Sequence, residues 1–390
     1  TLYLNEDTKK PIMTRRSAHV FFVIFSVLAV TESFQTSSKI DLVQAGPIQI
    51  SALGCGTWSW GNRLLWGYDP SQDDEIYQAY RTVRDAGVTV FDTADSYGTF
   101  DLNGRAEILL GNFERRYISE SSNQDQSSPY WNFISSLSKS SKSTRSQQIA
   151  TKLAPYPWRL TRESIVKAAV SSLERLGQDK LSIAQLHWST SKYLPQQESA
   201  LWEGISDVYD AGLCDAVGVS NYGPQQLQKA ASRFRDRNIP LAVAQIQYSL
   251  MTYKECQPMN QVCDDLNCRL ISYSPLCLGL LTGKYTLDNL PPPGNPRRQL
   301  FRELLPGAQD LLATLEIVAK EYDKTQSQVA INWAICKGTV PIPGVRTVKM
   351  AQENLGAAAG WKLSRDAMQE LDKVASRVSK PMIQNIFQTK

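Results

Sequence analysis

From about residue 46 onward, the chain alternates short β-branched runs with amphipathic stretches over about 300 residues. Alternation of this kind predicts a parallel sheet, because each parallel strand needs a helical crossover to reach the next. One unbroken series without a change in composition favours a single (β/α)8 barrel, followed by C-terminal helices, over two domains. The strands predicted with most support are 88–91, 148–151, 181–187, 216–219, 241–245, 269–273 and 339–342.

The segments between these strands have the spacing of helices that bury one face. In 161–177, apolar residues recur every three or four positions, Thr161 can cap the start and Gly177 can end the helix. "CGTWSWG" at 55–61 supplies the eighth strand, and 47–54 belongs to a hairpin that closes the barrel floor. The other predicted helices are 73–86, 105–116, 197–211, 225–234, 308–322 and 326–337.

The composition excludes several classes of function. A net charge of +4 without any long basic run argues against nucleic acid as a partner. The chain has seven cysteines and two histidines, and no C-x-x-C pair occurs. We therefore expect no disulfide framework and no metal site.

The first 45 residues differ from the rest and are predicted to be a targeting segment. From Met13, the presumed start after an upstream extension, two arginines precede an uncharged apolar run too short for a membrane span. Phe34 follows that run, which resembles the bipartite plastid signals of algae with secondary plastids. The expected location is the plastid stroma, with the secretory pathway or cytoplasm as runner-up, and the mature chain, 46–390, is not expected to insert stably into a membrane.

Residues 119–148 interrupt the alternation and are rich in serine. Such low-complexity composition is typical of a surface insertion rather than of a barrel element. Because the insertion follows a helix and precedes a strand, we expect it on the barrel face opposite the catalytic loops.

Polar side chains stand where the predicted strands end. Asp92 and Tyr97 follow one strand, and Lys152 and His187 follow the next two. Each alone is more typical of a hydrogen-bonded core residue or a solvated strand end, but the carboxyl ends of barrel strands meet at one mouth. The sequence therefore predicts a shared site.

These four residue types can form a general acid. An unperturbed tyrosine titrates near pH 10 and donates poorly at neutral pH. A lysine ammonium beside it favours the phenolate, an aspartate holds the ammonium, and a neutral histidine can orient a carbonyl oxygen. An alternative in which Lys152 forms a Schiff base needs an uncharged lysine, and Asp92 would keep it charged. Asp95 is interpreted as a surface or loop-capping residue.

Taken in order, the motifs "GCGTWSWG", "VTVFDTADSYG", "IATK", "LHW", "GVSNY", "QIQYSL", "YSPLCLGLLTGKY" and "IPGVRTVKMAQENLGA" resemble the aldo-keto reductase superfamily over residues 46–378. The branch is that of bacterial general reductases, potassium-channel β subunits and plant plastid-type reductases. The resemblance implies a (β/α)8 barrel with the catalytic residues Asp92, Tyr97, Lys152 and His187. It also implies NADP(H) bound without a Rossmann fold, and no strand–G-x-G-x-x-G–helix unit occurs.

The same resemblance assigns the cofactor contacts. Ser220, Asn221 and Gln245 would hold the nicotinamide carboxamide, and Tyr273 would stack on its ring. Met350 stands where relatives often have a phosphate-binding side chain, so the 2′-phosphate would rely on Arg346 and on Lys349. The remaining residues implied are Ser274, Leu276, Gly279 and Lys284 at the pyrophosphate, Glu353 and Asn354 at the adenosine, and Gly56, Thr57, Trp58 and Asp92 as further cofactor contacts.

The function implied is NADPH-dependent reduction of the carbonyl of an aldehyde or ketone to an alcohol. The alternative is an NADP(H)-binding regulatory or redox-sensing subunit with little turnover. Aromatic residues of the loops predict a hydrophobic or planar substrate; they are Trp58, Trp60, Trp66, Tyr68, Trp158 and Trp188.

Overall fold

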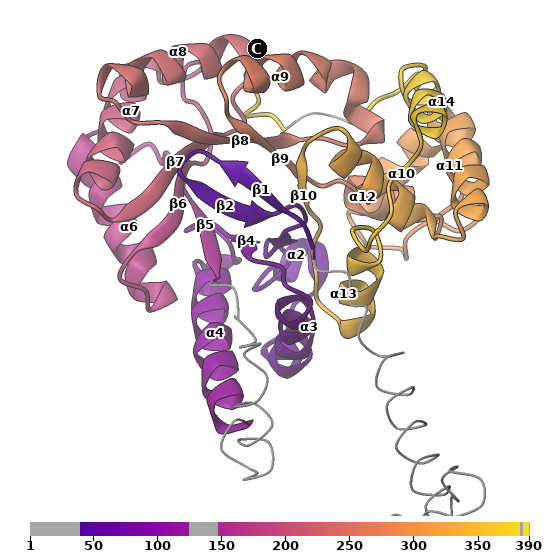
Figure 1. Cartoon of the computed structure of the whole chain (residues 1–390), viewed down its shortest axis with the longest axis horizontal. Coiled ribbons are helices and arrows are strands. Elements are labelled where there is room, and N and C mark those ends of the chain that lie inside the picture. Colours follow the sequence, from indigo (N-terminus) through magenta and orange to yellow (C-terminus); the bar gives the residue numbers. More distant parts are fainter. Residues whose placement is uncertain (1–39, 125–146, 383–384, 390) are drawn as a thin grey trace, which may run out of the picture. The chain divides into compact units, whose positions relative to one another are not determined.

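The computed structural model describes residues 40–124, 147–382 and 385–389. Within them, eight strands form one parallel sheet whose spatial order follows the chain (Figure 1). The predicted (β/α)8 architecture is therefore confirmed. The strands are β3 (Cys55–Gly56), β4 (Val90–Asp92), β5 (Gln148–Leu153), β6 (Leu181–Leu186), β7 (Cys214–Ser220), β8 (Leu241–Gln247), β9 (Arg269–Tyr273) and β10 (Val340–Ile342).

The first and last strands meet through glycine backbone. Gly56 forms a parallel bridge with Gly344, and the Gly54 and Gly56 amides donate to the Pro341 and Pro343 carbonyls at 2.9 and 3.0 Å. A Cβ on Gly56 would lie 2.8 Å from the Ile342 carbonyl oxygen, too close for any side chain. The glycine-rich segment at 55–61 thus supplies the eighth strand as predicted, but only two of its residues are strand.

A two-stranded antiparallel hairpin closes the floor of the barrel, as expected. Strand β1 (Leu42–Ala45) pairs with β2 (Ile48–Ser51), and the side chains of Ala45 and Ile50 are buried among the barrel's inward-facing residues. Gly46 makes the turn at φ 54°, where its Cα faces Ala242 closely. The boundary at residue 45 remains a prediction, but the barrel unit already begins at Ile40, so β1 belongs to the barrel.

Helices surround the sheet (Figure 1). Helix α9 was not predicted because Pro258 interrupts its pattern; the helix nevertheless continues through this proline, which is its sixth residue and has no amide hydrogen to donate to the Lys254 carbonyl. Helix α4 runs beyond the predicted end at 116 to Gln124, and β5 begins at Gln148; most of the predicted insertion lies outside the described residues. The helices are α2 (Arg63–Trp66), α3 (Asp73–Asp85), α4 (Arg105–Gln124), α6 (Arg162–Leu176), α7 (Pro195–Asp210), α8 (Pro224–Asp236), α9 (Tyr253–Asp265), α10 (Arg297–Leu304), α11 (Gln309–Glu321), α12 (Gln326–Cys336), α13 (Val348–Leu355) and α14 (Arg365–Ala375).

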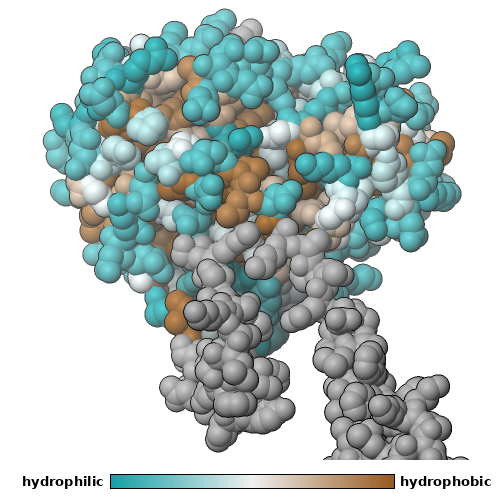
Figure 2. Space-filling view, in the orientation of Figure 1, coloured by the Kyte–Doolittle hydropathy of each residue, from teal (hydrophilic) through white to brown (hydrophobic). Residues whose placement is uncertain are grey.

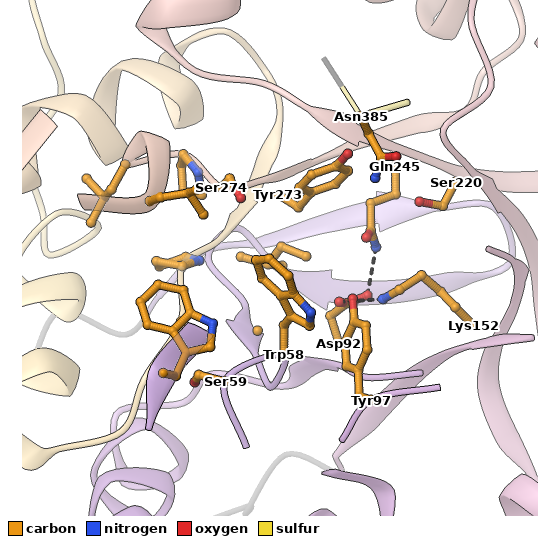
Figure 3. Close-up of a pocket in the computed structure, with 18 of the residues that line it drawn as sticks. Trp58, Ser59, Asp92, Tyr97, Lys152, Ser220, Gln245, Tyr273, Ser274 and Asn385 are labelled. Atoms are coloured by element: carbon orange, nitrogen blue, oxygen red, sulfur yellow. Dashed lines mark hydrogen bonds and ion pairs between the residues drawn. The ribbon is translucent and has the colours of Figure 1, made fainter. Parts of the chain in front are cut away.

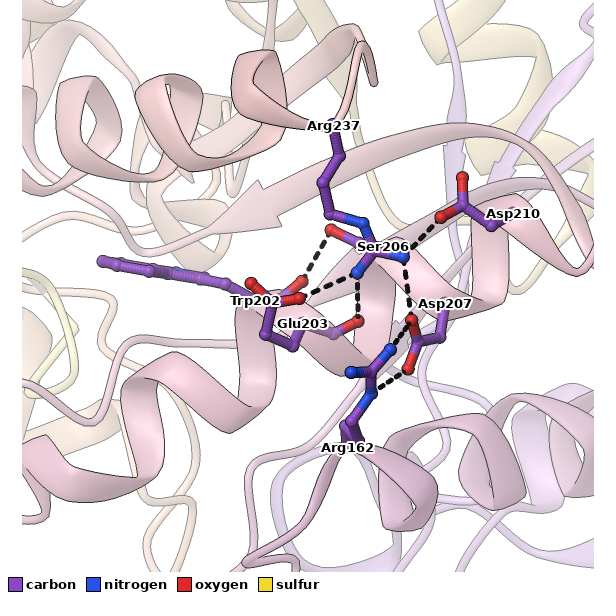
Figure 4. Close-up of polar contacts among 7 residues, drawn as sticks. All are labelled: Arg162, Trp202, Glu203, Ser206, Asp207, Asp210 and Arg237. Atoms are coloured by element: carbon purple, nitrogen blue, oxygen red, sulfur yellow. Dashed lines mark hydrogen bonds and ion pairs between the residues drawn. The ribbon is translucent and has the colours of Figure 1, made fainter.

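The outer surfaces of the helices are mainly hydrophilic on the face seen in Figure 2. Between α6, α7 and the end of α8, charged side chains form a network (Figure 4). Arg237 donates to Glu203 and Asp207, both at 2.9 Å, and Asp207 also pairs with Arg162. The network ties consecutive helices together on the outside of the barrel. Among the described residues, none of the helices has the length and apolarity needed to cross a membrane.

Candidate active site

A cavity of about 430 Å³ opens at the carboxyl ends of the barrel strands. All four residues of the predicted acid–base group line it: Asp92, Tyr97, Lys152 and His187. They come from the ends of three consecutive strands, β4, β5 and β6, and from the loop after β4. The parallel register places those ends side by side, because Asp92 pairs with Ala150 and Lys152 pairs with Gln185.

The centre of the cavity is a buried ion pair. Lys152 Nζ lies 2.6 Å from Asp92 Oδ2, with the two side chains 1% and 3% exposed. Gln245 Nε2, from β8 across the barrel, donates to the other carboxylate oxygen at 2.7 Å. Figure 3 shows Lys152, Tyr97 and Gln245 converging on Asp92. Burial lowers the pKa of Lys152, and the nearby carboxylate opposes that shift. The carboxylate thus orients both a cation and an amide.

Tyr97 lies beside this pair and is partly buried. Lys152 Nζ is 4.9 Å from the centre of the Tyr97 ring. Burial, and then the charge of Asp92, raise the pKa of Tyr97 well above its usual value. The ring therefore holds its proton at neutral pH and has one to donate. The ammonium next to the ring is the group that can stabilise the phenolate left after donation.

His187 faces Tyr97 from β6. The two ring centres are 5.7 Å apart, and His187 Nδ1 lies 3.2 Å from the Ser96 hydroxyl oxygen. Burial, and then the Lys152 charge, lower the pKa of His187 well below its usual value, so the imidazole is neutral. A neutral imidazole beside a phenol can hydrogen-bond a carbonyl oxygen without introducing a second charge.

Most, but not all, of the cofactor residues expected from the family resemblance reach the cavity. Thr57 is buried behind Asp92 and donates to its carbonyl oxygen at 3.0 Å, whereas Lys284 is exposed. Glu353 bonds Thr325, and Asn354 Nδ2 donates to the Gly344 carbonyl at 3.3 Å, so neither lines the cavity. Those that do are Gly56, Trp58, Asp92, Ser220, Asn221, Gln245, Tyr273, Ser274, Leu276, Gly279 and Arg346.

Two arginines gather at the far end of the cavity. Arg297 and Arg346 both lie over the Trp66 ring, at 4.9 and 5.8 Å from its centre. Arg346 is half buried, and burial together with the charge of Arg297 lowers its pKa. Among the described residues neither guanidinium forms an ion pair, so their positive charge is available to an anion. This end of the cavity fits a phosphate group of a dinucleotide.

The sequence analysis did not predict Arg297, because this residue lies at the start of helix α10 and not at the end of a predicted strand. Ser96, Asn385 and Phe387 also line the cavity without having been predicted. Phe387 stacks on Trp188 with ring centres 4.4 Å apart. Its position in the chain, beyond the last predicted barrel element, gave no signal of a place at the strand ends.

The predicted aromatic wall is only partly correct. Trp58, Trp66 and Trp188 line the cavity. Trp60 is instead fully buried in the core, where its indole N–H donates to the Val345 carbonyl at 2.7 Å. Tyr68 is buried and donates to Asp73 at 2.7 Å. Trp158 is 72% exposed, so these last three residues form no part of the wall.

Asp95 is not on the surface but does cap a loop. Its carboxylate is buried, accepts from the Ala154 amide at 3.1 Å and pairs with Arg159 at 2.5 Å. It therefore fixes the loop after β5 rather than taking part in the acid–base group. Within the described ranges, no cluster of three or more His, Cys, Asp or Glu side chains could hold a metal ion.

A parallel barrel with this buried Asp–Lys pair, tyrosine and histidine at its mouth is the arrangement of an oxidoreductase family. The model of the aldo/keto reductase family matches residues 52–376, and the chain belongs to that family. It is 49% identical over 349 residues to the chloroplastic pyridoxal reductase of Arabidopsis thaliana, covering 89% of each chain.

Two solved structures are similar to the fold. The glycerol dehydrogenase of Gluconobacter oxydans superposes with a TM-score of 0.68 at 21% identity, covering 91% of this chain and 100% of the other. The aldo/keto reductase of Klebsiella pneumoniae in complex with NADP and acetate gives 0.62 at 21% identity, covering 90% and 100%. Both likenesses show that the chain shares the fold of these structures.

The lowered pKa of His187 predicts a pH-dependent stability. Because its pKa is lowered in the folded state, the unfolded chain binds a proton more readily below about pH 6.5. The contribution of His187 to the free energy of unfolding is complete above that pH and falls by up to about 1.4 kcal/mol per pH unit below it.

Urea unfolding of the wild type and of His187→Gln at pH 7.5 and 5.5 measures this effect. Glutamine does not titrate, so the variant should lose less stability than the wild type between the two pH values, while losses from other groups cancel. Equal losses in both chains would show that the imidazole is protonated in the folded state.

Proposed function

We propose that this protein is an NADPH-dependent reductase that converts an aldehyde to a primary alcohol, with Tyr97 as the proton donor. The observation that carries the proposal is the cavity-lining phenol beside a buried Asp92–Lys152 pair separated by 2.6 Å. Bound NADPH supplies a hydride to the carbonyl carbon, and the phenol supplies a proton to the carbonyl oxygen. One alcohol and one NADP+ are formed for each NADPH and proton consumed.

The side chains divide this work between them. The ammonium of Lys152 stabilises the negative charge that develops on the Tyr97 oxygen as the proton leaves. Asp92 fixes that ammonium, and the neutral imidazole of His187 orients the carbonyl oxygen. Ser220, Asn221 and Gln245 would hold the carboxamide of the nicotinamide, and Tyr273 would stack on its ring.

The opposite end of the cavity binds the phosphates. Arg346 would neutralise the adenosine 2′-phosphate and Arg297 the pyrophosphate, and Ser274, Leu276 and Gly279 would line the pyrophosphate as well. Two guanidiniums facing each other without carboxylate partners repel one another, and a phosphate removes that repulsion. Discrimination in favour of NADPH over NADH follows from the extra anion.

We propose pyridoxal as the substrate. The related plant protein is a pyridoxal reductase, and the identity of 49% extends over nearly the whole chain. The substrate end of the cavity is lined by Trp58, Trp188 and Phe387, which suit a flat heteroaromatic ring. The charged side chains that line the cavity are Asp92 and Lys152, which pair with each other, and the two arginines at the far end.

Substitution of the phenol tests the chemistry. Tyr97→Phe removes one hydroxyl and keeps the ring, so folding and NADPH binding should survive. Pyridoxal-dependent loss of NADPH absorbance should fall about 10²- to 10⁴-fold, the usual worth of a positioned proton donor. Lys152→Met should cause a loss of similar size, and the double variant should lose no more than either alone, because both residues serve one proton transfer.

Two outcomes would contradict the proposal. If Tyr97→Phe keeps more than about a tenth of the wild-type rate, a loss below about 1.4 kcal/mol of barrier, another group donates the proton. If the wild type oxidises only one equivalent of bound NADPH slowly and then stops, the protein is a cofactor-binding sensor rather than an enzyme.

Replacement of a cavity arginine tests the cofactor assignment. Arg346→Leu should raise the KM for NADPH about tenfold or more, the worth of a charge-assisted contact, and leave the KM for NADH nearly unchanged. Lys320→Met, which removes an exposed charge on α11 paired with Glu316, is the matched control. Equal losses for the two cofactors would assign Arg346 to the pyrophosphate instead of the 2′-phosphate.

We also propose import into a plastid, on the strength of the arginine pair, the apolar run and Phe34, together with the chloroplastic location in the name of the plant relative. Residues 13–39, which end before β1, should direct a fused fluorescent protein to the plastid. The same fusion with both arginines and Phe34 replaced by alanine is the control. Cytosolic fluorescence from the unaltered fusion would contradict plastid import.

A further inference from the structure

The segment Asn385–Thr389 lies against the loop that follows β7. The Thr389 amide donates to the Asn221 carbonyl at 3.1 Å, and its hydroxyl accepts from the Gly223 amide at 2.9 Å. Thr389 is itself buried, with 8% of its surface exposed. One threonine thus bonds the backbone on both sides of Tyr222, holding the turn Asn221–Gly223 from outside the barrel.

Asn221 needs such support because its backbone is in the left-handed region, at φ 62°. Asparagine tolerates this conformation better than most residues do. The conformation is nevertheless stable only where neighbouring contacts hold it. The side-chain amide of Asn221 donates to the His187 carbonyl at 2.9 Å, and its oxygen accepts from the Tyr273 hydroxyl at 2.8 Å. A shift of this turn therefore moves an amide that lies between two other residues of the site.

The Tyr222 side chain in the same turn is fixed by a different group. Tyr222 donates its hydroxyl to the buried Glu198 carboxylate at 2.9 Å, and Glu198 also accepts from the Thr190 amide at 2.6 Å, in the loop after β6. These contacts set the position of Tyr222 but bond neither the Asn221 carbonyl nor the Gly223 amide. Thr389 is the partner that these two backbone groups have from outside the barrel.

We propose that Thr389 is a positioning residue for the cofactor: its two hydrogen bonds hold Asn221 in the backbone conformation that presents the side-chain amide to the nicotinamide carboxamide. The inference rests on the proposed function, because it takes Asn221 as a carboxamide contact. The same inference extends to the aromatic side chains at the substrate end of the cavity, whose position Thr389 would also help to fix. Phe387, two residues before Thr389, stacks on Trp188, and Lys192 donates to the Gln388 carbonyl between them.

The test compares two substitutions at this position. Thr389→Val keeps the branched shape and loses the acceptor for Gly223, whereas Thr389→Ser keeps the hydroxyl. Titration with NADPH, followed by quenching of tryptophan fluorescence, should give a dissociation constant about three- to tenfold higher for Val, the worth of one hydrogen bond. Ser should bind like the wild type. Thr82→Val, which removes one hydroxyl bond to the Gln78 carbonyl on α3, should have no effect on binding.

A double-mutant cycle identifies the route of the effect. Asn221→Gly removes the amide while accepting a positive φ, so this background should fold without backbone strain. If Thr389 acts through Asn221, then Thr389→Val in this background should cause no further loss of NADPH affinity. Thermal unfolding of each chain separates a loss of stability from a loss of cofactor binding.

Three results would overturn the inference. The first is NADPH affinity unchanged in Thr389→Val, and the second is an equal loss for the Ser and Val variants. The third is the same loss with and without the Asn221 amide, which would make Thr389 a purely structural residue. In all three cases the wild type still binds NADPH and reduces pyridoxal, so the proposed function stands. Failure of the wild type to bind NADPH would instead overturn both.

Discussion

The ion pair between Asp92 and Lys152 is the interaction on which the site depends. Two charges removed from water are costly unless each satisfies the other and the remaining lone pairs find donors. Here the second carboxylate oxygen accepts from Gln245, so strands β4, β5 and β8 all contribute to one charge cluster. The pair therefore fixes side chains from opposite parts of the barrel, and the phenol of Tyr97 takes its electrostatic surroundings from it.

The barrel in turn depends on close backbone contact between its ends. Strand β3 has only two residues, and its bridge to Gly344 is possible because Gly56 carries no side chain. A glycine-rich strand is a poor sequence signal for a strand, yet it is what lets the sheet close. Closure also brings Arg346, which follows β10, to the same mouth as the residues after β3 and β4.

The fold and the acid–base group could be predicted because both have local signatures. Strand–helix alternation is visible along the chain, and a polar residue at a strand end needs only the parallel topology to be placed. Arg297, Asn385 and Phe387 could not be found in this way, since they reach the cavity through helices and loops whose path depends on tertiary packing. The opposite error, at Trp60 and Tyr68, has the same origin: large aromatic residues next to a site also pack the core, and sequence alone does not separate the two roles. Helix α9 escaped prediction because Pro258 lacks the amide hydrogen that an interior helical position donates, so a proline there is more typical of the end of a helix than of its interior.

The β1–β2 hairpin has a consequence for the direction in which protons travel. Ala45 and Ile50 fill the bottom of the barrel with hydrocarbon, and the inward-facing layer above them consists of valine, isoleucine and alanine. These hydrocarbon side chains lie at the floor, whereas the cavity that holds Lys152 and Tyr97 opens at the carboxyl ends of the strands. Under the proposed chemistry, the phenolate left by each reduction is reprotonated by solvent that enters at the mouth, which becomes accessible once the alcohol has left. The alcohol therefore leaves first, and the phenolate of Tyr97 regains its proton afterwards through the same opening.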